Sequence, residues 1–266
     1  MKKTFVLGGM AAAVVLLSAA CVIPVYISDY GQYTTRGVFH RTIALDSGGT
    51  ILIENDAGDI EIQGWDKDEV EITAEEDLGG RYGWRVGPYG RSVAGPKVDV
   101  DKMEDFLTIK ARIPERERDI RRVYFTLNVP HSVNLKDVRN ELGDIRIVDI
   151  YGKVRVNLEE GIIKVENFSG SLDLSLVRGS VEAELLDVRK DDNVRITTRE
   201  GDITLYLQPD VNVKIEAATG NGGISSDFDL GLPLPSKKVS ARLGSLEEAV
   251  VSLSALIGNI RLKKIA

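Results

Sequence analysis

"GDIRIVDIY GKVRVNLEE GIIKVENFS GSLDLSLVR GSVEAELLD", residues 143 to 187, begins each of its nine-residue units with a glycine. The second and fourth residues after every glycine are apolar, and the residues between them are mostly polar. This alternation has the period of a β-strand that buries one face. The stretch therefore predicts a succession of short strands, each preceded by a turn at a glycine.

A period of 18 residues sorts the apolar positions further, because two different kinds of strand alternate. A chain that made one coil per period would stack equivalent residues of successive coils into a continuous apolar interior. The columns are Ile145, Ile163 and Val181; Ile147, Val165 and Ala183; Ile150, Phe168 and Leu186; and, on the other strand, Val154 with Leu172, Val156 with Leu174, and Leu158 with Leu176. We predict an all-β, right-handed parallel β-helix-like solenoid with about 18 residues per coil.

The alternation continues on both sides of this stretch, interrupted by insertions. It returns around residues 194–205, 213–217 and 251–260, and weaker copies lie between residues 51 and 72. We therefore predict a smaller N-terminal β region over residues 38–122 and a β-solenoid repeat region over residues 123–266.

The triplet Gly-Asp-Ile occurs at 58–60, 143–145 and 201–203, which raises the question of a metal site. In the repeat frame the glycine recurs at positions where the aspartate does not. A turn with positive φ requires glycine, and Asp, Asn or Ser beside it bonds turn amides. We predict structural turns, and no metal, at Gly58, Gly143, Gly161, Gly179, Gly201, Gly223 and Gly258. A calcium-binding roll, the alternative, uses several glycines per repeat and six to eight oxygen ligands.

The N-terminus has the pattern of an export signal. Lys2 and Lys3 precede a short apolar run, and "LSAAC" places small residues before Cys21, the only cysteine. This resembles the bacterial lipobox, in which the cysteine is acylated and becomes the mature N-terminus. We predict a signal peptide over 1–20, a lipid bilayer anchor at Cys21 and a tether over 21–37, with ordinary signal cleavage as the alternative. In lipoproteins of double-membrane bacteria, an aspartate directly after the acylated cysteine usually signals retention in the inner membrane. The residue after Cys21 is Val22, which favours the outer membrane.

The net charge of −7 and pI of about 5.1 argue against a nucleic-acid partner, which would need a basic surface. Nucleophilic or metal chemistry has little support either. The two histidines, His40 and His131, lie in no paired motif, and no G-x-S-x-G sequence is present. Asp191 and Asp192, in an insertion that breaks the repeat, would be the candidates in a carbohydrate-active enzyme, and a solvated charged loop is the simpler interpretation. We predict no catalytic residues and no cofactor.

The stretch "GGRYGWRVGPYGRSVAGP", residues 79–96, is the segment least like the repeats. Exposed aromatic and arginine side chains are typical of binding hot spots. It is our candidate binding loop, with a long unstructured loop as the alternative, and its residues are Arg81, Tyr82, Trp84, Arg85, Tyr89 and Arg91.

Three motifs together resemble the bacterial putative-adhesin family of envelope β-solenoid domains. They are a V-P-x-x-V-N sequence at 129–134, the recurring G-D-I turns, and a G-N-G-x-I-S step at 220–225. The resemblance covers about residues 40–266. It implies a β-helix-like fold and an extracytoplasmic location, and it supplies no catalytic residues.

These observations favour a non-enzymatic envelope lipoprotein that binds a surface glycan or another envelope protein. Two alternatives stay open: a carbohydrate-active β-helix enzyme, and a regulatory partner in an envelope-stress response.

Overall fold

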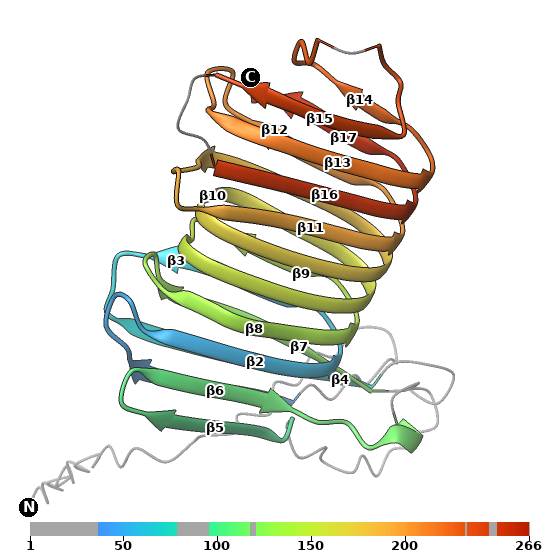
Figure 1. Ribbon diagram of the computed structural model, residues 1–266. Helices are drawn as coiled ribbons and strands as arrows, with labels where there is room; N and C mark the ends of the chain where they lie inside the picture. Colours follow the sequence, from blue (N-terminus) through green and yellow to red (C-terminus); the bar gives the residue numbers. More distant parts are fainter. Residues whose placement is uncertain (1–36, 79–95, 118–120, 232, 245–248, 266) are drawn as a thin grey trace, which may run out of the picture.

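Almost every regular element in the described part of this chain is a β-strand. The computed structural model describes residues 37–78, 96–117, 121–231, 233–244 and 249–265 (Figure 1). Within them, seventeen strands join in one hydrogen-bonded sheet, and η1 (Glu115–Glu117) is a single 3-10 turn. The predicted all-β class is confirmed.

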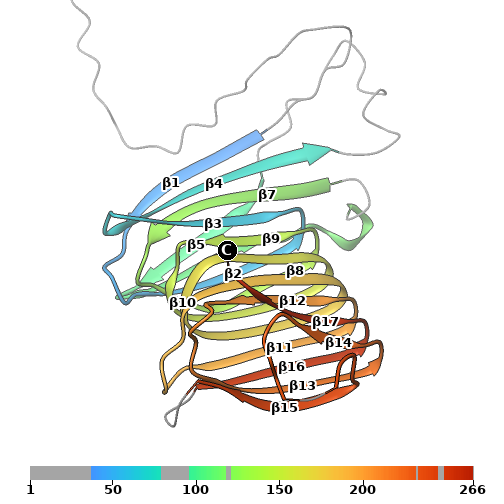
Figure 2. The same cartoon turned by 90° about the horizontal axis from the view of Figure 1, so that it is seen from above.

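The strands wind into a stack that has two faces (Figures 1 and 2). Face A runs in the order β5 (Val98–Met103), β6 (Phe106–Ala111), β2 (Thr50–Ala57), β8 (Asn134–Leu142), two stretches of β10 (Tyr151–Asp187), β11 (Asn193–Glu200), β16 (Ala249–Ile257), β13 (Val213–Asn221) and β15 (Lys238–Leu243). Face B runs in the order β1 (Gly37–Ala44), β4 (Glu69–Leu78), β7 (Arg121–Pro130), β3 (Ile60–Trp65), β9 (Ile145–Val148), two further stretches of β10, β12 (Ile203–Leu207), β17 (Ile260–Lys264) and β14 (Ile224–Ser226).

The core lies between the two faces, because each strand turns its apolar residues inward. In β2 the burial alternates residue by residue, as expected for a strand with one solvated face. The predicted columns are buried: Ile145 and Ile163 are 0% exposed and Val181 is 1% exposed. Burying an aliphatic side chain of this size stabilises the fold by about 1.5–3 kcal/mol. The stacked columns are therefore the main source of stability.

Leu186 is the exception among the predicted column residues. It is only half-buried, and Leu185 takes the inward position at 1% exposed. The cause is that strand alternation runs on without a break through Val181, Ala183 and Leu185, so no corner residue equivalent to Phe168 follows.

Parallel pairing between coils follows the register of the repeat. Ile163 pairs with Ile145 and Val165 with Ile147. The insertion before β11 is absorbed in a turn, so that Leu172 still pairs with Val194. The inward column therefore continues past the point where the sequence spacing changes.

Both ends of the stack depart from chain order. At the first end, the coil of β2 and β3 lies between the β6–β7 coil and the β8–β9 coil. At the other end, the coil of β16 and β17 lies between the β11–β12 coil and the β13–β14 coil. Antiparallel strands finish both ends, with β1, β4 and β5 at one and β15 at the other.

The N-terminal strands share the core of the repeat region. The sequence predicted a boundary between residues 122 and 123, whereas β2 and β3 pair directly with β8 and β9. Buried residues from both sides of that boundary belong to one hydrophobic cluster. The described strands before residue 122 therefore extend the stack and do not form a separate β region.

Candidate binding trough on face A

Outward side chains of face A line a trough that crosses the strands. It consists of three adjoining hollows of about 470, 540 and 530 Å³. The first and second share Arg195, and the second and third share Thr197, Ala218 and Ser254. Side chains at paired positions of neighbouring parallel strands point the same way. The trough therefore follows the stack from β2 to β15 as one continuous surface.

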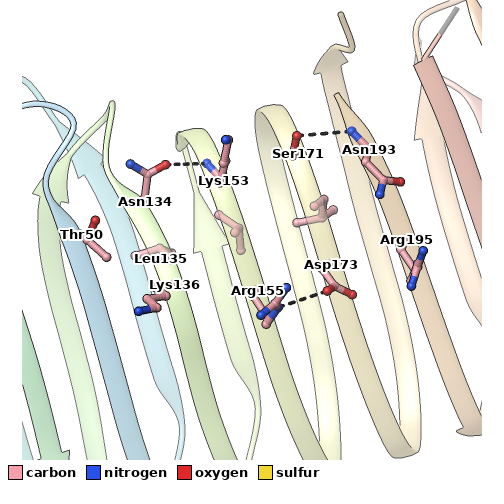
Figure 3. Close-up of a pocket in the computed structure, with 12 residues that line it drawn as sticks. Thr50, Asn134, Leu135, Lys136, Lys153, Arg155, Ser171, Asp173, Asn193 and Arg195 are labelled. Carbon is pink, nitrogen blue, oxygen red and sulfur yellow. Dashed lines mark hydrogen bonds and ion pairs between the residues drawn. The ribbon is translucent and has the colours of Figure 1, made fainter. Parts of the chain in front are cut away.

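Figure 3 shows two rows of polar side chains in the first hollow. The row near the starts of the strands consists of Thr50, Asn134, Lys153, Ser171 and Asn193. The second row consists of Lys136, Arg155, Asp173 and Arg195. The floor between them is formed by the core residues Leu135, Val154 and Leu172.

The first hollow carries more positive than negative charge. Arg155 Nε donates to Asp173 Oδ2 at 3.1 Å, and these two residues, 18 apart in sequence, link neighbouring coils. In the described part of the chain, no carboxylate lies within ion-pair distance of Lys136, Lys153 or Arg195. Lys136 instead lies over the ring of Phe106, with 5.2 Å between Nζ and the centroid. Three cations are thus left for an external anion.

Face B shows the opposite arrangement. Arg146 lies between two carboxylates, with its guanidinium 2.7 Å from Glu61 Oε1 and 2.6 Å from Glu166 Oε2. Burial lowers the pKa of Arg146, but its contacts with Glu61 and Glu166 outweigh this and raise it. The basic side chains Arg146, Lys164 and Arg261 of face B are thus paired with carboxylates of the protein, in contrast to the three cations of the first hollow.

The first row also fixes the backbone of neighbouring coils. The amide of Lys153 donates to Asn134 Oδ1 at 3.2 Å, and the amide of Asn193 donates to Ser171 Oγ at 3.3 Å. Ser171 Oγ in turn donates to Asp192 Oδ1 at 3.2 Å. Since Asn134 and Ser171 bind the backbone of the next strand in the stack, the strands under the trough are held in register and present a pre-formed surface.

The three hollows of the trough differ in chemistry. The second hollow is lined by small hydroxyl side chains together with Glu216 and Lys238, and those hydroxyl residues are Thr197, Ser240, Ser252 and Ser254. The third hollow contains the exposed apolar residues Val177 and Leu256, beside Arg199. The trough is therefore cationic from β2 to β11 and hydroxyl-lined from β11 to β15, with a partly apolar hollow beside these toward the C-terminal ends of β11, β16 and β13 and the adjoining stretch of β10.

Sequence reasoning did not single out the cations of the trough. They lie on three different strand stretches and come together only when the coils stack. An outward column would have found them, because Lys136, Arg155 and Arg195 each directly follow an inward residue of the repeat. Those inward residues are Leu135, Val154 and Val194. The columns considered from the sequence were the inward ones.

The predicted turn glycines form a ladder along one edge of the stack. Gly58, Gly143, Gly161, Gly179, Gly201 and Gly258 all have positive φ, from 114° to 151°. A Cβ added to Gly161 would collide with the carbonyl oxygen of Gly143, and one added to Gly179 would collide with that of Gly161. Close approach of backbones, as well as the φ angle, therefore excludes a side chain at these positions.

Gly223 was the wrong choice for the turn of its coil. Gly222 has the positive φ, 159°, and a Cβ on it would meet the carbonyl oxygen of Gly258. A Cβ on Gly223 would make only ordinary contacts. The "GNGG" run permits either glycine, and the strand that follows starts at Ile224 after one further residue, as it does at the other turns.

The aspartates that follow the glycines join one coil to the next. Asp59 Oδ1 accepts from the amide of Asp144 at 2.9 Å, and Asp144 Oδ1 accepts from the amide of Ile162 at 2.8 Å. Asp202 Oδ1 accepts from the amide of Asn259 at 2.7 Å, and Asp202 Oδ2 lies 2.8 Å from Arg261. Burial raises the pKa of Asp202, but the Asn259 amide and Arg261 more than offset this and lower it.

The remaining candidates from the sequence also have structural partners. His131 is half-buried, stacks on Tyr151 with 5.2 Å between ring centroids, and places Nδ1 2.7 Å from the Asp149 carbonyl. It lies where the chain crosses from the β7 coil to the β8 coil. His40 lies beside Thr73 on β4. Asp192 caps its own turn, since Oδ2 accepts from the Arg189 amide at 2.9 Å.

Several predicted features lie outside the described residues. These are the signal peptide, Cys21, nearly all of the tether, and the candidate loop with Arg81, Tyr82, Trp84, Arg85, Tyr89 and Arg91. In the part of the chain that is described, no group of three or more His, Cys, Asp or Glu side chains is placed to hold a metal ion. No helix there is long and apolar enough to cross a bilayer.

A family model described as Toastrack DUF4097 matches residues 127–263, about half of the chain. The chain belongs to this family. The resemblance to the putative-adhesin group, drawn from the V-P-x-x-V-N, G-D-I and G-N-G-x-I-S motifs, is thereby confirmed. No curated protein matches the chain.

Solved structures similar to this Toastrack chain come from several bacteria. A putative cell adhesion protein from Clostridium sporogenes is 13% identical, with 85% of this chain and 99% of that chain covered and a TM-score of 0.50. A putative adhesin from Bacteroides fragilis is 13% identical, with 85% and 96% covered and a TM-score of 0.34. A putative lipid binding protein from Parabacteroides distasonis is 12% identical, with 86% and 97% covered and a TM-score of 0.34. The likeness to the Clostridium structure shows a shared fold.

Proposed function

We propose that this protein is a non-enzymatic lipoprotein of the cell envelope whose β-solenoid is a binding scaffold of the adhesin type. The observation that carries the proposal is the trough on face A, a continuous surface that crosses the strands from β2 to β15. Extended surfaces on stacked repeats are commonly used to bind elongated partners. The partner is a surface glycan or another envelope protein.

The proposed winding is that of a right-handed parallel β-helix with about 18 residues per coil in its central part. The pairing of Ile145 with Ile163 and the Asp144–Ile162 bond, 18 residues apart, support this coil length. Parallel strands joined by crossovers are overwhelmingly right-handed, which supports the hand.

The proposed location is outside the cytoplasmic membrane, on the outer membrane where the source has two. The cysteine after "LSAA", at position 21, supports a lipid anchor, since two or more acyl chains hold a protein stably on a bilayer. The description of the Clostridium sporogenes structure as a cell adhesion protein is consistent with a surface location. A Cys21→Ser variant should lose both metabolic labelling by a fatty-acid analogue and sedimentation with membranes.

The enzymatic alternative has no specific support in the described residues. Glycoside hydrolysis needs two carboxylates facing each other across a bound sugar. Asp192, one of its candidates, instead accepts bonds from Ser171 and from the Arg189 amide. The regulatory alternative is a binding role as well, and the two differ in the identity of the partner.

The test is a binding survey with the purified full-length lipoprotein in detergent, using an array of bacterial and host glycans together with cross-linking in intact cells. We expect saturable capture of a glycan or of one envelope protein, with no new reducing ends. A variant lacking residues 79–95 would show whether the candidate loop contributes. Turnover of a bound glycan would overturn the non-enzymatic role, and the absence of any captured glycan or protein would overturn the binding role.

A further inference from the structure

The proposed binding role rests on the trough, and the charges in its first hollow indicate what it binds. We propose that this hollow recognises a linear acidic polysaccharide, whose sugar carboxylates pair with Lys136, Lys153 and Arg195. Asp173 holds Arg155 between them, through the 3.1 Å contact from Arg155 Nε to Asp173 Oδ2. This inference depends on the proposed function and adds the chemical class of the ligand.

The charge balance of the whole protein makes this hollow unusual. The chain carries 41 acidic and 34 basic residues, so free cations are not expected to gather by chance. On face B, Arg146, Lys164 and Arg261 each have a carboxylate within 3.0 Å. Among the described residues, Lys136, Lys153 and Arg195 have none within ion-pair distance. These three cations lie together in one hollow, and their charge complements an anion.

The spacing of the cations favours a polymer over a small anion. Lys136 is on β8 and Arg195 on β11, with the two stretches of β10 between them. Neighbouring strands lie about 4.8 Å apart, so these two residues are separated by about 14 Å along the trough. A single carboxylate or phosphate contacts side chains within about 4 Å and cannot reach both. A chain with a repeated anion, lying across the strands, can.

The other lining residues suit sugar hydroxyls. The first row offers hydroxyl and amide groups from Thr50, Asn134, Ser171 and Asn193, and the second hollow continues with further hydroxyls. Each of these groups can donate and accept hydrogen bonds. Because the first row is tied to the backbone of adjacent coils, its geometry is set before a ligand binds, which reduces the entropy cost of binding.

Other polyanions fit the trough less well. Proteins that hold single-stranded nucleic acid stack the bases on aromatic side chains, and no aromatic residue is among those that line the three hollows. An anionic membrane is bound by clustered basic residues that reach the headgroup plane, with apolar side chains inserted beside them. The cations here line a recess on the broad face of a sheet.

The experiment measures binding of the full-length protein in detergent to polygalacturonate, with dextran as the uncharged polysaccharide. We expect binding to polygalacturonate that weakens as salt is raised. The double variant Lys153→Glu/Arg195→Glu should weaken it by about tenfold or more, since two charge-assisted contacts become repulsive. Lys102→Glu, an exposed cation on β5 outside the trough, is the control and should change binding by less than about twofold.

Folding is checked by thermal melts, and Arg195→Gln provides a second variant without a reversed charge. Equal binding by the wild type and both trough variants would overturn the inference. So would dextran binding as tight as polygalacturonate, or a preference for single-stranded DNA or for phosphatidylglycerol vesicles. Capture of a neutral glycan or an envelope protein with no response to polygalacturonate would refute the acidic ligand while leaving the binding scaffold intact. Capture of nothing would refute both.

Discussion

The middle of the stack and its two ends are built differently. In the middle, coils that follow one another in the chain are also neighbours in space, as in the pairing of Ile145 with Ile163. At the ends, a later coil lies beside an earlier one out of order. Arg146 thus reaches Glu61 across 85 residues, and Asn259 reaches Asp202 across 57. The middle is a repeat with local contacts, and the ends are closed by long-range ones.

The ends differ from the middle for a physical reason, because an exposed strand edge is open to pairing with another chain. A stack of identical coils would leave two such edges. Here antiparallel strands follow the last parallel coils, and the outermost strand of face A, β5, carries Asp99, Asp101 and Lys102. Charged residues on an edge strand discourage further pairing. The ends therefore work as caps for the repeat.

The largest loss of stability in the middle of the stack is expected when a charged side chain is placed in one of the inward columns. Ile163→Asp would bury an unpaired carboxylate between two coils, and we expect a loss of at least about 4 kcal/mol of unfolding free energy, enough to abolish cooperative folding. Ile162→Asp is the matched control, since the Ile162 side chain, next to Ile163 in the chain, is 45% exposed. Circular dichroism melts compare the two. Equal tolerance of both substitutions would show that the column is not the source of stability.

The next largest effect is the loss of stability when a turn glycine is replaced by alanine, and it should differ between a turn inside the stack and a turn at its margin. Gly161 and Gly48 both have positive φ, 147° and 90°, but a Cβ on Gly161 would strike the Gly143 carbonyl whereas one on Gly48 meets nothing within 4 Å. Backbone strain costs about 1–3 kcal/mol at either site, and the collision adds about 1–3 kcal/mol at Gly161. Urea unfolding of Gly161→Ala and Gly48→Ala should show the larger loss at Gly161. Equal losses would mean that close packing of the turns is unimportant.

Much of the middle could be predicted from the sequence, because inward positions repeat at a fixed period and burial depends on position alone. Ile145, Ile163 and Val181 are buried for that reason. The ends could not be predicted in the same way. The repeat of Val251 and Leu253 indicates a strand with one buried face, but nothing in it indicates that β16 pairs with β11 as well as with β13. The order of the coils in the stack depends on where insertions let the chain cross from one coil to a coil that does not follow it in sequence.

The candidate site was predicted less well than the fold. The recurring glycines were recognised as turns, apart from the choice of Gly223 over Gly222. The trough cations were missed because each is an ordinary outward residue within its own strand, and its significance depends on neighbours contributed by other coils. Arg195, for instance, lies opposite Asp173 only because four inserted residues are absorbed before β11.

A smaller effect is expected from the aspartates beside the turn glycines. Asp144→Ala removes the acceptor for the Ile162 amide, which is exposed and can bond water instead. We expect a loss of about 1 kcal/mol, with most of it restored in Asp144→Asn, which keeps an oxygen acceptor. Denaturant melts measure both variants. A loss at Asp144→Ala as large as that at Ile163→Asp would contradict the structural role assigned to this aspartate.

The smallest effect concerns the pH dependence of the coil inserted near the C-terminal end. The pKa of Asp202 is lowered, because the Asn259 amide and Arg261 outweigh the raising effect of burial. A carboxyl with a lower pKa in the folded state stabilises the protein above its unfolded pKa of about 4, and that contribution is lost as the pH falls through the folded value. We therefore expect the Tm of Asp202→Asn to lie below that of the wild type at about pH 7, and this gap to close as the pH is lowered toward about 3.

Arg261→Gln tests the cause of that shift. The Tm of Arg261→Gln should lie below that of the wild type at about pH 7, by less than for Asp202→Asn, and this difference should shrink as the pH falls. The double variant should follow the same pH profile as Asp202→Asn, since the two residues act through one ion pair. A gap that stayed constant from about pH 7 to about pH 3 would show that the contribution of Asp202 is not ionic. The inserted coil would then be held by the Asn259 hydrogen bond and its core residues, in the same way as the coils of the middle.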